Sequence, residues 1–108
     1  MINSLKTKTK YQIKYTSSFK HNYKKIKKQG KDVQKLKNVI SKLADGLILE
    51  EKYKNHILND NKNYKNCGEC HIEPYWLLVY KYKDDELILL LVATGSHPDF
   101  VLTLNKRE

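Results

Sequence analysis

The chain has 108 residues and a formal net charge of +9, and 40% of its residues are apolar. This length and composition suit one domain with one hydrophobic core. No stretch approaches the roughly 20 apolar residues that a membrane-spanning helix needs. The lysine-rich start also lacks the apolar stretch of a secretory signal. We therefore expect a cytoplasmic protein without a membrane partner.

The positive charge is concentrated in the N-terminal part of the chain. Residues 1–40 contain twelve lysines and one acidic residue, whereas residues 41–108 contain nine basic and eleven acidic residues. A basic surface attracts phosphate backbones, and the same field attracts an acidic partner protein. A lysine-rich composition with no specific role is the simpler alternative, and the charge alone does not decide between them.

We expect residues 1–10 to form a flexible basic tail. Residues 11–15 alternate apolar and polar side chains, which predicts a first strand. Ser17 or Ser18 can then cap a helix by accepting a hydrogen bond from a free backbone N–H, and Gly30 is suited to end it. The apolar stripe of this helix consists of Phe19, Tyr23 and Ile26, and lysines surround it.

A second helix is predicted from about Val33 to Ala44, with Asp32 as its N-cap and Gly46 as its end. The two helices would form a hairpin that packs its apolar stripes on a sheet and turns its lysines to solvent. Residues 47–66 lose the periodic pattern and contain many asparagines, which is typical of a loop.

Three further strands are predicted in the rest of the chain. They lie at residues 68–72, 76–82 and 86–94, with a short edge at residues 100–104 as an option. The order is therefore β-α-α-β-β-β, and we expect an α+β fold with a helical hairpin on one face of a mainly antiparallel four-stranded sheet. The other face, beside the 47–66 loop, would be open for a site. Residues 11–104 would form this single domain, and residues 105–108 a tail.

Histidine is the side chain best able to give and take protons near neutral pH, and the chain has four. His21 lies among lysines of the first helix, where a surface position is expected. His56, His71 and His97 lie on different elements of the C-terminal half, and neighbouring antiparallel strands could bring His71 and His97 to one end of the sheet. Taken singly, each of these histidines is more often structural than catalytic.

Several short motifs follow one another in the C-terminal half. They are Tyr53-Lys-Asn-His56, His71-Ile-Glu-Pro-Tyr-Trp76, Leu77-Leu-Val-Tyr80, Asp84-Asp-Glu-Leu87 and Thr94-Gly-Ser-His97. In this order and at this spacing they resemble the YafQ-type toxins of the RelE/ParE superfamily. The resemblance covers about residues 11–101 and is strongest over residues 69–97.

The resemblance implies a RelE-like fold and an activity. YafQ-type proteins are toxins of type II toxin–antitoxin systems that cut mRNA on the ribosome, and a cognate antitoxin protein neutralises them. A ribose 2′-hydroxyl attacks the neighbouring phosphate, which needs a base, an acid and positive charge but no cofactor. The matching histidines are His56, His71 and His97. His97 is the implied acid, and His71 or His56 the base.

Positive charge for RNA binding is expected from the loop lysines, and an aromatic contact from the C-terminal end. The residues expected to bind RNA are Lys54, Lys62, Lys65 and Phe100. Gly68 and Ala93 stand where the family commonly carries arginines, and Tyr75 stands where it carries an aspartate. An arginine fork binds two phosphate oxygens, so an alternative hypothesis is a weakened or inactive relative that still binds antitoxin and ribosome.

Cys67-Gly-Glu-Cys70-His71 matches the spacing of haem attachment and offers ligands for zinc, with His97 or His56 as a further ligand. Haem is disfavoured because the sequence shows no export signal. A small zinc protein is the stronger of these two alternatives. Because neighbouring residues of a strand point to opposite faces, Cys70 and His71 would need a bend to share one ion. We therefore expect no metal, with Cys70 as a core residue.

Overall fold

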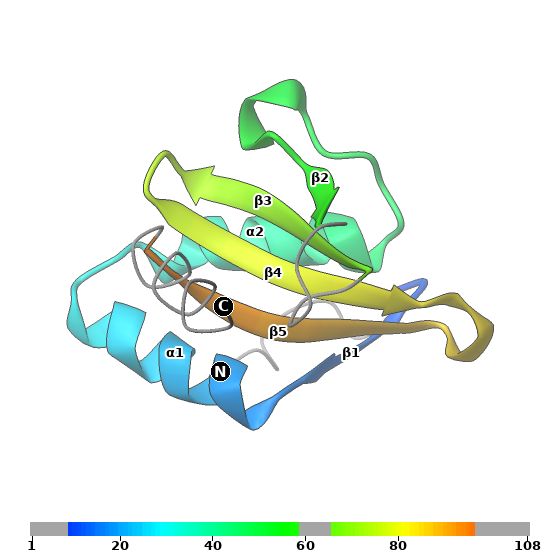
Figure 1. Cartoon of the computed structure of the whole chain (residues 1–108), viewed down its shortest axis with the longest axis horizontal. Helices are drawn as coiled ribbons and strands as arrows, with labels where there is room; N and C mark the ends of the chain where they lie inside the picture. Colours follow the sequence, from blue (N-terminus) through cyan, green and yellow to red (C-terminus); the bar gives the residue numbers. More distant parts are fainter. Residues whose placement is uncertain (1–8, 59–65, 97–108) are drawn as a thin grey trace, which may run out of the picture.

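The computed structural model describes residues 9–58 and 66–96. It confirms an α+β fold with two helices on one sheet (Figure 1). The main elements are β1 (Gln12–Tyr15), α1 (Ser17–Lys28), α2 (Val33–Ala44), β2 (His56–Leu58), β3 (Cys67–Glu73), β4 (Trp76–Lys83) and β5 (Ile88–Ser96). Short 3₁₀ turns lie at Glu51–Tyr53 and Asp84–Glu86. Neither helix is long and apolar enough to cross a membrane, as far as the described residues extend.

The sheet is mainly antiparallel, as predicted, but within the described residues it has five strands rather than four, in the order β1-β5-β4-β3-β2. β1 runs parallel to β5, and the other neighbours are antiparallel. The additional strand is β2, which lies inside the segment expected to be a loop. Three residues are too few to show a periodic pattern, so only the pairing with β3 defines this strand. Residues 56–58 thus extend the sheet by one edge strand.

The helix ends follow ordinary capping chemistry, with one correction. The N-cap of α1 is Thr16 and not Ser17 or Ser18, because Thr16 keeps an extended backbone and its hydroxyl accepts from the N–H of Phe19 at 3.0 Å. Asp32 caps α2 as predicted, and α2 has the predicted bounds. Gly30, with a φ of +81°, follows the end of α1 in the left-handed region that glycine tolerates best.

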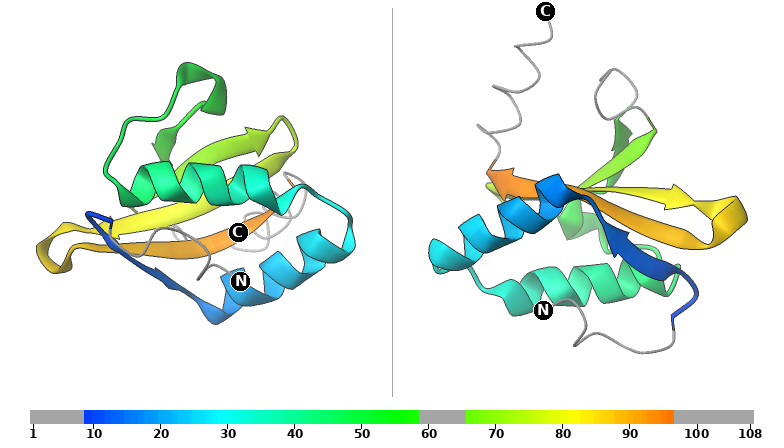
Figure 2. Two further views of the ribbon diagram at one scale, coloured as in Figure 1. Left: turned by 180° about the vertical axis from the view of Figure 1, so that it is seen from behind. Right: turned by 90° about the horizontal axis from the view of Figure 1, so that it is seen from below.

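The core lies between the helices and one face of the sheet. The predicted stripe of α1 is buried, and α2 buries Leu36, Val39, Ile40 and Leu43. These side chains pack with sheet residues that include Cys70, Trp76, Leu78, Leu89 and Leu91. Figure 2 shows α2 crossing the strands when the molecule is seen from behind. Each fully buried apolar side chain contributes roughly 1.5–3 kcal/mol, so this face holds the domain together.

The strand bounds differ from the predicted ones by at most two residues, and other predictions fall outside the described residues. The strand expected at residues 86–94 begins at Ile88, because Leu87 has a left-handed backbone with a φ of 52° after the 3₁₀ turn. The optional edge at residues 100–104, the tail at residues 105–108 and nearly all of the tail at residues 1–10 lie outside the described residues.

The buried thiol of Cys70 makes the protein less stable at alkaline pH. Burial raises the pKa of the Cys70 thiol to about 12, from 9.0 when unperturbed. Above about pH 9 the unfolded chain ionises while the folded chain does not, so stability is lost as the pH rises towards 12. This thiol should lower the free energy of unfolding by about 1.4 kcal/mol per pH unit in that range. Urea unfolding at several pH values measures the slope.

The matched variant for this measurement is Cys70→Ala, which lacks the ionisable group. Its free energy of unfolding should fall less steeply above about pH 9 than that of the wild type. Equal slopes in the two proteins would show that the buried thiol is not the cause.

Candidate functional site

β3 presents two titratable side chains on the sheet face away from the helices. Glu69 pairs with Val79, and His71 pairs with Leu77. Val79 and Leu77 belong to a small apolar cluster that is separate from the helix-side core. Cys70 lies between Glu69 and His71 in sequence and points into the core, as the alternation of a strand requires.

β2 places His56 directly beside Glu69. The two residues are partners in the strand pairing, and His56 Nε2 lies 3.2 Å from Glu69 Oε1. His56 Nδ1 lies 2.9 Å from the carbonyl oxygen of Lys54. A carbonyl oxygen only accepts, so Nδ1 carries the proton in this contact. The ring is therefore held at both nitrogens, while half of its side-chain surface stays exposed.

The register also brings His56 and His71 close together. His71 is two residues beyond Glu69 on β3, so the two histidines are diagonal neighbours on one face. Such neighbours have Cα atoms about 7–8 Å apart. A ribose–phosphate linkage can lie between side chains at that spacing.

His97 lies outside the described residues, so its place in the site stays a prediction. The strand that precedes it ends at Ser96, which pairs with Trp76. Gly95 pairs with Leu77, and Leu77 pairs on its other side with His71. The last described residues before His97 are therefore at the same end of the sheet as His71.

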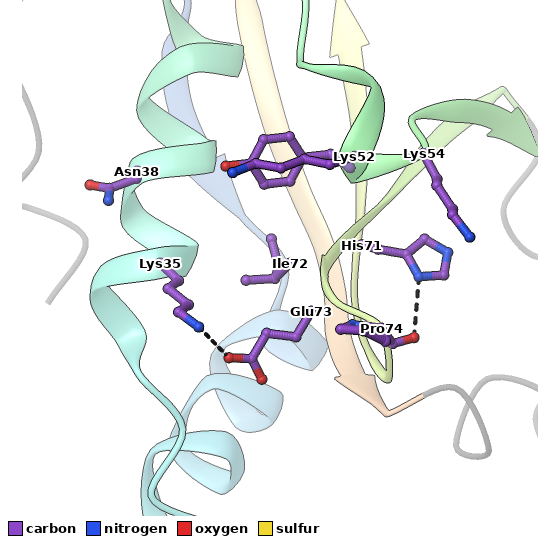
Figure 3. A pocket seen from close by; sticks show the side chains of 9 residues that line it. Lys35, Asn38, Lys52, Lys54, His71, Ile72, Glu73 and Pro74 are labelled. Atoms are coloured by element: carbon purple, nitrogen blue, oxygen red, sulfur yellow. Dashed lines mark hydrogen bonds and ion pairs between the residues drawn. The ribbon is translucent and has the colours of Figure 1, made fainter.

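His71 borders an open pocket of about 510 Å³ between α2 and the segment that leads into β2. Its Nδ1 lies 3.3 Å from the carbonyl oxygen of Pro74. Figure 3 shows Lys54 and His71 on one side of the pocket and a pair formed by Lys35 and Glu73, 2.8 Å apart, on the other. The hydrogen bond to Glu73 raises the pKa of Lys35, so this lysine stays charged.

The expected RNA-binding residues are only partly described. Lys54 lines the pocket next to His71, whereas Lys62, Lys65 and Phe100 lie outside the described residues. Sequence reasoning missed Lys52, which lines the same pocket. It also assigned no role to Glu69, although its spacing of two residues from His71 on a predicted strand would have placed both on one face.

The three departures from the family pattern occupy different surroundings. Ala93 is 5% exposed and packs with Cys67, Leu77 and Val79, so an arginine there would have to displace apolar neighbours. Tyr75 is 77% exposed. At Gly68 an added Cβ would lie 2.6 Å from the hydroxyl oxygen of Tyr80, so this position accepts no side chain without a shift.

Strand geometry argues against the zinc and haem hypotheses. Cys67 packs in the cluster with Leu77, whereas Cys70 packs in the helix-side core, on opposite faces of β3. Burial raises the pKa of both thiols, which disfavours the thiolate form that metals bind. Within residues 9–58 and 66–96, no group of three or more histidine, cysteine or acidic side chains is arranged to hold a metal ion.

A buried hydrogen-bond network fixes the end of β5. Trp76 Nε1 donates to Thr94 Oγ1 at 2.9 Å, and Thr94 Oγ1 donates to the carbonyl oxygen of Leu77 at 2.7 Å. The backbone N–H of Thr94 donates to Asn22 of α1 at 3.2 Å. Trp76 is fully buried in the helix-side core, so its ring is not available to stack on a base.

Comparisons with known proteins found related sequences and similar structures. The mRNA interferase toxin YafQ of Escherichia coli strain B is 34% identical over 86 residues, which cover 79% of this chain and 89% of that protein. A metal-bound toxin from Helicobacter pylori matches with a TM-score of 0.76 and 37% identity, over 82% of this chain and 97% of that one. A chain of the E. coli DinJ–YafQ toxin–antitoxin complex matches with a TM-score of 0.74 and 32% identity, over 83% of this chain and 96% of that one.

The same comparisons assign the chain to a class of proteins. A family model described as a bacterial toxin of type II toxin–antitoxin system, YafQ, matches residues 11–101. The fold is that of a small RelE-like toxin. The chain belongs to the YafQ family.

Thr94 offers a test of the network that leads into the site. Thr94→Val keeps the shape but leaves the Trp76 N–H and the Leu77 carbonyl without this partner. The free energy of unfolding should fall by about 1–3 kcal/mol, as for other unsatisfied buried polar groups. Urea denaturation measures it. Thr94→Ser retains the hydroxyl, so its free energy of unfolding should fall clearly less than that of Thr94→Val. Equal losses of stability in the two variants would show that the hydrogen-bond network is not the cause.

Proposed function

We propose that this chain is the toxin of a toxin–antitoxin pair and cleaves mRNA on the ribosome by histidine acid–base chemistry. The observation that carries the proposal is the pairing of β2 with β3, which sets His56 and His71 on one face beside the lysine-bearing pocket. The identity to proteins named mRNA interferase supports it. The reaction uses no cofactor.

The geometry favours His71 as the general base. The Pro74 carbonyl oxygen accepts a hydrogen bond from Nδ1–H of His71, which leaves the lone pair of the neutral ring on Nε2. That lone pair can take the proton of a ribose 2′-hydroxyl. His56 has oxygen atoms at both nitrogens, and a doubly protonated ring satisfies both contacts. In this arrangement His56 supplies positive charge to the developing phosphorane, and His97 protonates the leaving 5′-oxygen.

The proposed partners follow from charge and from the relatives. The E. coli relative is seen in complex with the antitoxin DinJ, and we propose a cognate antitoxin for this chain as well. α1 exposes a lysine-rich surface, which suits the phosphate backbone of ribosomal RNA and mRNA. Its exposed lysines are Lys20, Lys24, Lys25, Lys27 and Lys28. Binding to ribosomes implies a cytoplasmic location.

The first test compares histidine variants under inducible expression. The wild type should arrest growth and produce new mRNA 5′ ends within translated regions. His71→Ala and His97→Ala should each lower the cleavage rate by about 10²–10⁴-fold, the usual contribution of an acid or a base. His21→Ala serves as the matched control, because His21 is exposed on α1. Unchanged cleavage in His71→Ala and His97→Ala would refute the assigned chemistry.

Ala93 and Tyr75 favour a second candidate, a toxin relative that no longer cleaves but still binds its antitoxin and the ribosome. Ala93 is buried in an apolar cluster, so this part of the sheet face presents no arginine to a phosphate group. Normal growth on expression of the wild type, together with tight antitoxin binding, would select this candidate.

Lys54 is the described lysine best placed to compensate for the missing arginines. It lines the pocket with His71, and its own carbonyl holds His56. Lys54→Ala should lower kcat by about 10²-fold, within the range for losing one contact to transition-state charge. Lys83→Ala removes an exposed lysine at the opposite end of β4 and should leave kcat within about twofold. Equal losses of kcat in the two lysine variants would mean that the overall positive charge, and not this contact, is what cleavage requires.

A further inference from the structure

The tyrosine that ends the Trp-Leu-Leu-Val-Tyr segment of β4 reaches across β3 to the segment before β2. Tyr80 pairs with Gly68 in the β3–β4 register. Its hydroxyl donates to the side-chain oxygen of Asn55 at 2.5 Å, across 25 residues of sequence. Asn55 immediately precedes His56, the first residue of β2. The side chain thus connects the central strand of the sheet to the start of the edge strand.

Gly68 makes this crossing possible. An added Cβ at Gly68 would lie 2.6 Å from the Tyr80 hydroxyl oxygen and 2.8 Å from Tyr80 Cε1, both far below an ordinary carbon contact. An aromatic ring lying over a cross-strand glycine is a recognised way to stabilise a sheet.

β2 depends on such an anchor because it has little other support. It is an edge strand of three residues, and it pairs only with β3 among the described strands. Ile57 is 55% exposed, and half of the His56 side-chain surface is exposed as well. Short exposed edge strands open easily, because few buried contacts hold them.

The Tyr80 hydroxyl is a permanent donor. Tyr80 is only 3% exposed. Burial raises the pKa of its hydroxyl to about 12, so the proton stays in place at any pH at which RNA cleavage is measured.

We propose that Tyr80, acting through Asn55 and given room by Gly68, is a positioning residue that holds His56 in the site. The inference rests on the proposed function of His56. The hydroxyl of Tyr80 fixes Asn55. The next residue, His56, therefore keeps its pairing with β3, and its ring stays between Glu69 and the Lys54 carbonyl. Without the bond the start of β2 moves, and His56 loses its place beside His71.

The test compares two hydroxyls on the same strand and the same face. Tyr80→Phe removes the bond to Asn55. Tyr82→Phe removes a similar bond, from Tyr82 to the carbonyl oxygen of Leu43 at 2.6 Å, which ties the sheet to α2 instead. In ribosome-dependent cleavage Tyr80→Phe should lower kcat by about 10-fold or more with KM unchanged, because small displacements of catalytic groups are costly. Tyr82→Phe should leave kcat within about twofold, although it should lower the free energy of unfolding about as much as Tyr80→Phe does.

Two further variants separate positioning from general loss of structure. Asn55 is exposed, so its replacement does not endanger folding. Asn55→Leu removes the acceptor and should reproduce the kcat of Tyr80→Phe, whereas Asn55→Asp keeps an acceptor oxygen and should retain most of the activity. Gly68→Ala should also reproduce Tyr80→Phe, since the new methyl group displaces the ring.

A spectroscopic measurement makes the result independent of activity. Long-range ¹H–¹⁵N spectra of the histidine rings should show shifted or broadened His56 signals in Tyr80→Phe and Asn55→Leu, and unchanged ones in Tyr82→Phe. Unchanged His56 signals with unchanged kcat in Tyr80→Phe would overturn the inference, as would equal kcat losses in the two tyrosine variants. If the wild type cleaves no mRNA, the proposed function fails, and the His56 signals alone decide the positioning role.

Discussion

The alternation of side chains along β3 is the constraint on which the rest of the structure depends. Cys70 and Ile72 face the helices and are buried in the core, while Glu69 and His71 face the other way. The hydrophobic free energy that holds one face in the core therefore also fixes which residues the other face presents. A shift of the β3 register by one residue would bury the polar side chains Glu69 and His71 and expose Cys70 and Ile72, at a cost of several kcal/mol.

Much of this fold could be predicted from the sequence, because long periodic segments carry their own signal. α2 begins and ends where its apolar stripe, Asp32 and Gly46 indicated. β2 could not be predicted, since three residues show no period and their partners on β3 are distant in the sequence. The candidate site could likewise be predicted only in part. The sequence motifs pointed to His56 and His71, but their adjacency depends on β2, and Glu69 and Lys52 gained a role only from contacts in three dimensions.

The positive charges that the structure places beside His71 belong to lysines. Ala93 is packed into an apolar cluster, while Lys52 and Lys54 line the pocket beside His71. A lysine on the short segment before β2 supplies a point charge, without the two-pronged hydrogen bonding of an arginine on a central strand. Its effect therefore depends on how firmly that segment is held, which ties the electrostatics of the site to the anchoring of β2.

The parallel pairing of β1 with β5 has a consequence for the synthesis of this protein. Gln12 pairs with Ile88 and Tyr15 with Leu91, so the first described strand finds its partner only in the last. A nascent chain cannot complete the sheet until nearly all of it has left the ribosomal exit tunnel, and contacts this distant in sequence form slowly. An unfinished chain thus lacks β5, the strand that joins β1 to the rest of the sheet, and any toxicity to the translating cell has to wait until this strand has been made.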